Sequence, residues 1–169
     1  MTSSLRFVML LLTALVLQRF LFDQFRVAGV VADGFLVLSV ASGMVGGVRR
    51  GAFVGFFAGL VFDLLVVTPF GLGALSYLVA GALGGLLEGF VVRSARWITM
   101  LVAFVASGLG VLFFAVLGSL IGTEGMVDSR LVAVTFLVSG SSAVLVLPTC
   151  HVVRWAAVDV EPFRAAIHP

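Results

Sequence analysis

The sequence has no lysine, a single cysteine and little charge of either sign. Charged residues make up 11% of its 169 residues, whereas hydrophobic residues make up 62%. A soluble globular domain carries roughly 25% charged residues, so this composition excludes that class. Because a helix needs about 20 apolar residues to cross a bilayer, the length allows five or six spans and no sizeable extramembrane domain. We therefore expect an all-α integral membrane protein, with residues 1–169 in one polytopic domain.

Several functional classes are excluded by what the chain lacks. Its ten basic residues are all arginines, scattered as singles and pairs, whereas a nucleic-acid surface needs a dense basic patch, so we expect no nucleic-acid partner. The lone Cys150 excludes an intramolecular disulfide and a cysteine-based metal cluster. His151 and His168 have no partner at metal-ligand spacing. Since no nucleophile elbow, phosphate-binding loop or paired carboxylate site occurs either, we expect no enzyme activity, cofactor or metal.

The hydrophobic segments predict a compact bundle of six transmembrane helices, with five as the alternative count. The second segment is short, but Arg49 and Arg50 separate it from the third, which would otherwise continue as one overlong apolar run. The first segment ends at Gln18 and Arg19 without a small-residue cleavage site, so we interpret it as a retained helix. The predicted spans are residues 5–22, 34–48, 51–67, 71–92, 97–121 and 131–150, followed by a tail at 151–169.

The arginines also predict the orientation of the bundle. With six spans, seven arginines fall on one side, and three fall on the other together with four acidic residues. The positive-inside rule then places both termini in the cytoplasm, with Trp97 and Trp155 at the cytoplasmic interface. Glu88 lies near Arg93 and Arg96 on this side, which predicts an interfacial ion pair. The cytoplasmic arginines are Arg6, Arg49, Arg50, Arg93, Arg96, Arg154 and Arg164.

Glycine recurs at four-residue spacing on one face of the third span and one face of the fourth. Missing side chains let helix backbones approach closely, and such packing holds helices together in lipid. We expect these faces to pack within the bundle, with a groove for a partner's helix as the alternative. Ser39, Gly43 and Gly47 repeat the pattern on the second span, as do Gly118 and Gly122 on the fifth. The candidate interface glycines are Gly51, Gly55, Gly59, Gly81, Gly85 and Gly89.

Asp63 is an acidic residue in an otherwise apolar span. At 1.5 Å per residue it lies about 6 Å inside the predicted boundary of the membrane. A carboxylate at that depth costs several kcal/mol, on the order of 3 or more, unless it is paired or reaches a polar layer. We expect a structural role, in which Asp63 reaches water, caps backbone donors at the turn from Thr68 to Gly71, or pairs with Arg19 or Arg26. A proton or ion relay and a contact with a partner are the alternatives.

The segment around Asp63 carries a family resemblance. It reads GFFAGLVFDLL over residues 55–65 and PFGLGALSY over residues 69–77. This order of glycine-rich helix, acidic residue, turn with Pro69 and Gly71, and second glycine-rich helix resembles the rod shape-determining protein MreD family. The specific match covers Gly51 to Gly89, and length, hydropathy and loop charges agree over the whole chain. By this resemblance, Asp63, Pro69, Gly71 and the glycines of the two helices are the family-pattern positions.

The resemblance implies a bundle similar to the S components of energy-coupling-factor transporters, in the bacterial inner membrane. It implies a non-enzymatic scaffold of the cell-elongation complex that binds MreC through transmembrane helices. RodA, a class B penicillin-binding protein and MreB would be its neighbours, and it would help to position lateral-wall peptidoglycan synthesis. The alternative is a vitamin-binding S component. Its usual Ala-x-x-x-Ala pair is missing from the first helix, FVMLLLTALVLQRF, although the outer loops offer Asp23, Gln24, Arg26 and Asp33 as candidate ligands.

Overall fold

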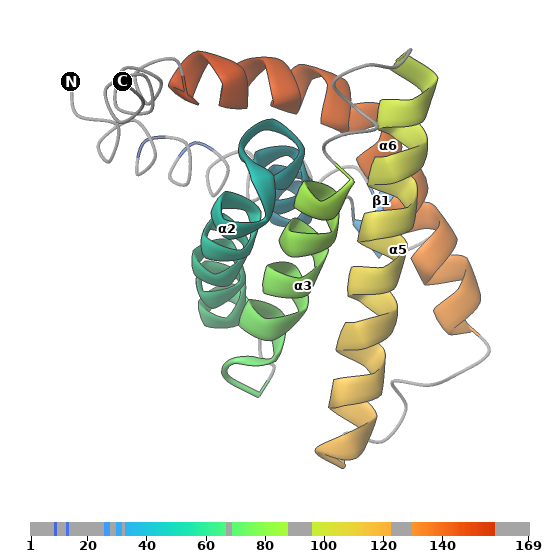
Figure 1. The fold of residues 1–169 in the computed structure, drawn as a ribbon. Coiled ribbons are helices and arrows are strands. Elements are labelled where there is room, and N and C mark those ends of the chain that lie inside the picture. Colours follow the sequence, from blue (N-terminus) through green and yellow to red (C-terminus); the bar gives the residue numbers. More distant parts are fainter. Residues whose placement is uncertain are drawn as a thin grey trace.

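The computed structural model describes Met9, Thr13 and residues 26–27, 30–31, 33–66, 69–87, 96–122 and 130–157. These residues form four helices and one pair of two-residue strands (Figure 1). The strands β1 (Arg26–Val27) and β2 (Val30–Val31) pair antiparallel. The predicted helical class is confirmed for the described part of the chain. The helices are α2 (Gly34–Leu65), α3 (Leu72–Leu86), α5 (Arg96–Leu120) and α6 (Arg130–Ala157).

Two of the described helices are long and apolar enough, by length and composition, to cross a membrane. These segments are Arg96–Leu120 and Leu131–Trp155. The helix α3 has 15 residues, and residues 88–92 of its predicted span lie outside the described part of the chain. The predicted span at 5–22 also lies outside it, apart from Met9 and Thr13. The four described helices do not support the predicted six-helix bundle or its likeness to S components.

The helix α2 consists of two arms joined at Gly47. This residue has φ 79° and ψ 177°, a conformation that essentially only glycine adopts. The sequence predicted two spans, at 34–48 and 51–67, separated by Arg49 and Arg50. The structure has two helical arms at nearly these positions, and the break between them lies at Gly47, two residues before Arg49, because the backbone of this glycine permits the sharp turn. We call residues 34–46 the first arm and residues 48–65 the second arm.

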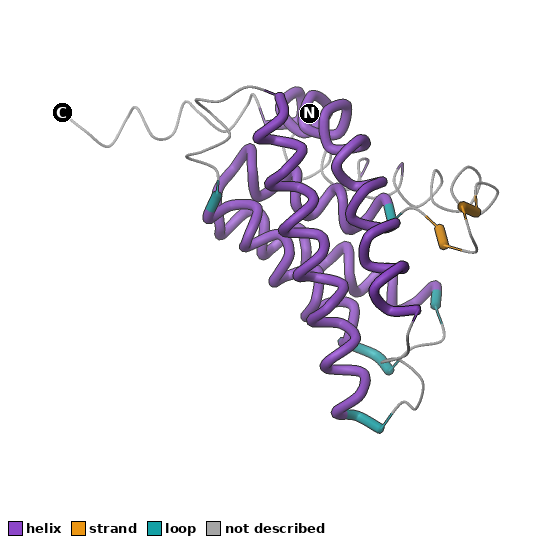
Figure 2. The backbone as a smooth tube through the Cα atoms, turned by 90° about the vertical axis from the view of Figure 1, so that its right-hand side faces the viewer, coloured by secondary structure: helices purple, strands orange, loops and turns teal. Residues whose placement is uncertain are grey.

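The first arm of α2 lies at the centre of the molecule. Every residue from Phe35 to Met44 is buried, so this arm has neighbours on all sides rather than one apolar face. It packs with α3, α5 and α6, which contribute Ala80, Ala106 and Val146 to the same core. Figure 2 shows the helices gathered in one body, with the two strands to one side.

The helix α6 changes direction along its length. Pro148 has no amide hydrogen to donate to the carbonyl of Val144, and this loss kinks a helix. Figure 1 shows the later part of α6, drawn in red, lying across one end of α2 and α3. We call residues 145–157 the crossing segment of α6. Its buried stripe consists of Val146, Cys150 and Val153.

The crossing segment extends beyond the predicted span. The sequence predicted a span over residues 131–150 followed by a tail, and the helix α6 includes the first seven residues of that tail, to Ala157. The helix continues because its buried stripe repeats at helical spacing beyond Cys150, to Val153. By contrast, α5 agrees with its predicted span of 97–121 to within one residue at each end.

Candidate functional site

The carboxylate of Asp63 caps the N-terminus of α3. Its Oδ2 accepts hydrogen bonds from the amides of Gly71 at 2.9 Å and Ala74 at 3.2 Å, and its Oδ1 accepts one from Gly73 at 2.9 Å. The first amides of a helix have no partner within the helix, and the helix dipole favours a negative charge beside them. These bonds offset the cost of burying Asp63, which is only 5% exposed. Among the roles that the sequence suggested for Asp63, the structure shows the capping role.

The turn between α2 and α3 is shaped by Pro69 and Gly71. Gly71 is the N-cap residue of α3 and has φ 98°, a left-handed conformation that favours glycine. The carbonyl of Pro69 accepts a hydrogen bond from the amide of Leu72 at 3.2 Å. Since glycine has no side chain to cap the helix, Asp63 supplies the cap from the preceding helix. Thr68, which the sequence placed in the same turn, lies outside the described residues.

The glycines of the second arm lie directly against the backbone of α3. A Cβ built on Gly55 would lie 2.6 Å from the carbonyl carbon of Tyr77, and one on Gly59 would lie 2.5 Å from the Cα of Ala74. Real Cβ atoms essentially never come within 3.0 Å of another heavy atom in this way. Only glycine therefore permits this separation of the second arm and α3.

The first arm joins the same contact. A Cβ on Gly51 would lie 2.6 Å from the Cα of Gly43 and 2.7 Å from the carbonyl carbon of Gly81. A Cβ on Gly85 would lie 2.5 Å from the Cα of Val48, beside the turn of α2. Three helical segments thus meet where glycines remove the side chains, and the chain itself fills these faces. Of the candidate glycines, Gly89 lies outside the described residues.

Gly122 has a different role from the one that its spacing suggested. It follows the end of α5 with φ 84°, and a Cβ on it would have no atom within 4 Å. Its amide donates to the carbonyl of Ser119 at 3.2 Å. Gly122 therefore ends the helix, in the manner of a left-handed C-terminal cap, rather than packing against another one.

A second buried carboxylate, Asp33, connects the start of α2 to the middle of α3. Its Oδ1 accepts hydrogen bonds from the amides of Phe35 at 3.0 Å and Leu36 at 3.1 Å, and its Oδ2 accepts one from the hydroxyl of Tyr77. Burial raises the pKa of the Asp33 carboxyl above its usual value, while the hydrogen bonds from Tyr77 and the two amides oppose this rise. Both oxygens of this candidate vitamin ligand are thus engaged within the protein.

A local sequence signal could have predicted the Asp33 cap, although the sequence suggested only a loop ligand at this position. Aspartate is a preferred N-cap residue, and here it directly precedes the apolar run of the first arm. Its partner Tyr77 is 44 residues away in the chain, so the hydrogen bond between them has no such signal. The ring of Tyr77 also packs on that of Phe62, with the ring centroids 5.3 Å apart.

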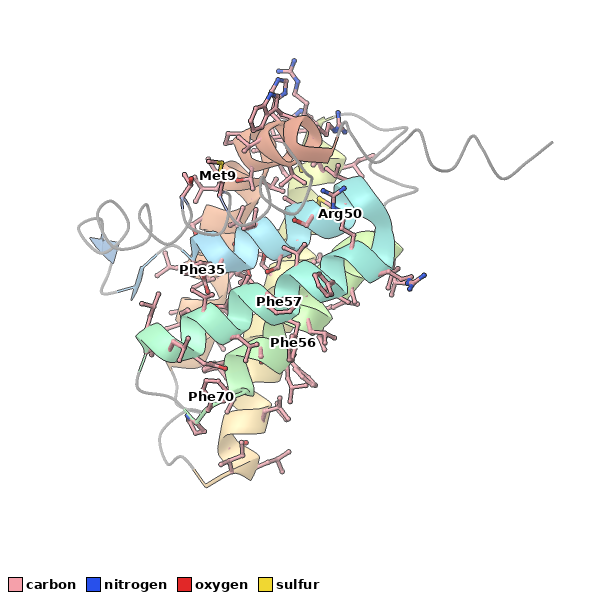
Figure 3. All side chains as sticks on the ribbon, turned by 90° about the vertical axis from the view of Figure 1, so that its left-hand side faces the viewer. Met9, Phe35, Arg50, Phe56, Phe57 and Phe70 are labelled. Atoms are coloured by element: carbon pink, nitrogen blue, oxygen red, sulfur yellow. The ribbon has the colours of Figure 1, made fainter. Side chains whose placement is uncertain are left out.

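The outward side of the second arm is aromatic. The ring centroids of Phe53 and Phe57 are 4.7 Å apart, and those of Phe56 and Phe57 are 5.7 Å apart. All three side chains are exposed, Phe53 by 60%, and Figure 3 labels Phe56 and Phe57 along this arm. We call these three residues the phenylalanine face. This face is an apolar surface that the rest of the described chain leaves exposed.

Comparisons with known proteins find no matching family model, no matching curated protein and no matching solved structure. Within the described residues, no group of three or more His, Cys, Asp or Glu side chains is placed to hold a metal ion. The glycine contacts and the Asp63 cap come together in the hairpin formed by the second arm, the turn and α3.

Proposed function

We propose that this chain is a non-enzymatic membrane scaffold of the bacterial cell-elongation complex, with the role that the MreD resemblance implies. One observation carries the proposal: the segment with the resemblance coincides with the second arm, the turn and α3, and Asp63 fastens these parts together. The pattern positions Pro69 and Gly71 shape the same turn. The proposed setting is a six-helix bundle in the inner membrane, with both termini in the cytoplasm.

The phenylalanine face is the proposed docking surface for the helix of MreC. The glycine faces of α2 and α3 are filled by the chain itself, so a partner must meet another side of the hairpin. Helices associate in lipid through van der Waals packing, to which large apolar rings can contribute. The glycine contacts and the Asp63 cap join the second arm to α3, and the arm presents Phe53, Phe56 and Phe57 on its exposed side.

Recognition of this kind requires no reaction and no cofactor. With MreC bound, the scaffold would place RodA, the class B penicillin-binding protein and the MreB filament around a common site of lateral-wall synthesis. In this proposal the glycine contacts on the buried side of the hairpin maintain the shape of the hairpin, and the phenylalanine face on its exposed side binds the partner.

Photo-crosslinking in living cells tests the proposed docking surface. A photoreactive amino acid replaces Phe53 in one variant and Leu101, which is 62% exposed on α5, in a matched control. We expect a crosslink to MreC from position 53 and little from position 101, at equal amounts of protein in the membrane. Equal yields from both positions, or no crosslink to MreC from either, would contradict the proposal. Crosslinks to an ATPase pair and its membrane coupling subunit would favour the vitamin carrier.

A further inference from the structure

One end of the described structure carries exposed arginines beside both tryptophans of the chain. Figure 1 shows the turn of α2, the start of α5 and the crossing segment of α6 at this same end. The side chains of Trp97 and Trp155 are 81% and 65% exposed, and each follows an exposed arginine in the sequence. We call this end the arginine–tryptophan rim. It consists of the exposed residues Arg49, Arg96, Trp97, Arg154 and Trp155 and of the half-buried Arg50.

The rim has an excess of positive charge. The only acidic residues that the structure describes, Asp33 and Asp63, both accept hydrogen bonds at helix N-termini within the hairpin region. With the predicted topology, this side of the chain holds seven arginines against the three acidic residues Glu88, Asp159 and Glu161. A surface of this charge is complementary to an anionic partner.

The crossing segment exposes basic and aromatic side chains near its end. Its stripe of Val146, Cys150 and Val153 is buried, while its other side exposes His151, Arg154 and Trp155. Basic and aromatic residues on the exposed surface of a membrane protein are typical of the boundary between lipid headgroups and acyl chains. Tryptophan itself is enriched at that depth because its ring is apolar and its indole N–H is polar.

We propose that the arginine–tryptophan rim binds the phosphate headgroups of anionic phospholipids. Arginine donates two parallel hydrogen bonds to phosphate oxygens, which is stronger and more specific than a single point charge. The tryptophans set the depth at which the arginines meet the headgroups. The proposal requires the chain to lie in a membrane, but it is independent of the scaffold role in cell elongation.

Quenching of tryptophan fluorescence by brominated lipids tests this proposal. Because Trp97 and Trp155 are the only tryptophans, fluorescence excited selectively at tryptophan, and not at Tyr77, reports on the rim alone. The purified protein is placed in phosphatidylcholine vesicles that contain brominated phosphatidylglycerol or, in a parallel series, brominated phosphatidylcholine. We expect phosphatidylglycerol to quench at a several-fold lower mole fraction, and we expect high salt to reduce this preference. Equal quenching by the two lipids would overturn the proposal.

Arginine variants test the assignment to the rim. The triple variant Arg49→Gln, Arg50→Gln, Arg154→Gln should lose the preference for phosphatidylglycerol. The matched variant Arg26→Gln, Arg130→Gln removes charge elsewhere and should keep it. If the triple variant does not fold, Arg154→Gln alone, at an exposed position, should still reduce the preference at least twofold. An unchanged preference in a folded rim variant would overturn the assignment.

Discussion

The Oδ1 atom of Asp63 lies 2.9 Å from the amide nitrogen of Gly73, ten residues later in the chain. This bond joins the end of the second arm to the beginning of α3, so one carboxylate closes the hairpin and caps its second helix. An acidic residue in an apolar segment thus has a physical explanation that requires no ion or proton pathway. The stability of the hairpin should therefore depend on the hydrogen bonds of Asp63.

Replacing Asp63 by alanine should destabilise the folded protein. The change leaves the amides of Gly71, Gly73 and Ala74 without their carboxylate partner in a buried place. Losing a helix cap costs about 1 kcal/mol of stability, and buried donors without a partner cost about 1–3 kcal/mol. We therefore expect the free energy of unfolding to fall by about 2–3 kcal/mol. The thermal midpoint of the detergent-solubilised protein measures this loss.

The neighbouring Leu64 provides the control for this substitution. It is 73% exposed on the same turn of helix, so Leu64→Ala should change the midpoint little. Asp63→Asn should fall between the two, because the amide keeps one oxygen acceptor but loses the charge that favours the helix N-terminus. If Asp63→Ala and Leu64→Ala had the same midpoint, the cap would contribute nothing to stability.

Alanine substitutions of two glycines should have opposite effects. At Gly55 the added Cβ would overlap the backbone of Tyr77, so the second arm and α3 would have to separate. Overpacking of this kind costs about 1–3 kcal/mol or more. At Gly140, inside α6, a Cβ would have no atom within 4 Å, and alanine is the better helix former by about 1 kcal/mol.

Size-exclusion chromatography after heating compares the thermal stability of the two glycine variants. Gly55→Ala should lower the temperature at which half of the protein remains monodisperse, and Gly140→Ala should leave it unchanged or raise it. The same decrease for both variants would indicate that helix propensity or expression, rather than backbone contact, limits the protein.

The hairpin could be predicted from the sequence because its signals are local. Glycines at four-residue spacing indicated the close faces, and Asp63 before a turn with Gly71 suggested the cap. The bounds of α5 followed from a long apolar run that ends near Arg96 and Leu120. In each case, residues near one another in the chain determine the geometry.

Other features depend on residues that are distant in the chain. The hydrogen bond from Tyr77 to Asp33 spans 44 residues, and nothing at either position predicts the other. The direction of the crossing segment depends on the core beneath Val146 and Val153, which only the packed helices create. The pair Arg49 and Arg50 indicates a break near this point because charge is rare in an apolar sequence, but its exact position depends on the backbone conformation of Gly47.

Gly47→Ala should loosen the turn of α2. Its φ of 79° with ψ near 177° is costly for any residue with a Cβ, by about 1–3 kcal/mol. The rate of cleavage by trypsin measures this effect. Trypsin cleaves the peptide bonds after Arg49 and Arg50, which follow the turn, only when the backbone there opens. We expect faster cleavage there in Gly47→Ala than in the unchanged protein.

The adjacent Gly46 provides the matched control for the turn. The three atoms nearest to a Cβ on Gly46 all belong to the side chain of Arg50, whose Cδ at 2.2 Å can rotate away and whose Cβ at 3.2 Å needs only a small shift. Gly46→Ala should therefore be cleaved at nearly the rate of the unchanged protein. Equal acceleration in both variants would show that the turn is sensitive to any added side chain and not to the conformation of Gly47.

A double-mutant cycle should show that Asp33 and Tyr77 stabilise the protein together. The variant Tyr77→Phe removes the hydroxyl that donates to Asp33, and Asp33→Asn removes the charged acceptor while keeping a cap for Phe35 and Leu36. A hydrogen bond to a charged group contributes about 1.5–3 kcal/mol, so each single change should cost an amount near this range.

The cycle is informative because the free-energy costs of the two substitutions should not add. Once Tyr77 has lost its hydroxyl, the Oδ2 atom of Asp33 is a buried charged acceptor without its donor, so Asp33→Asn should then cost little or become favourable. Denaturant or thermal unfolding of the two single variants and the double variant gives the coupling energy, which we expect to be at least about 1 kcal/mol. Strict additivity would mean that the hydrogen bond does not hold the first arm of α2 to α3, and that core packing and the contacts of Gly43 with α3 keep these segments together.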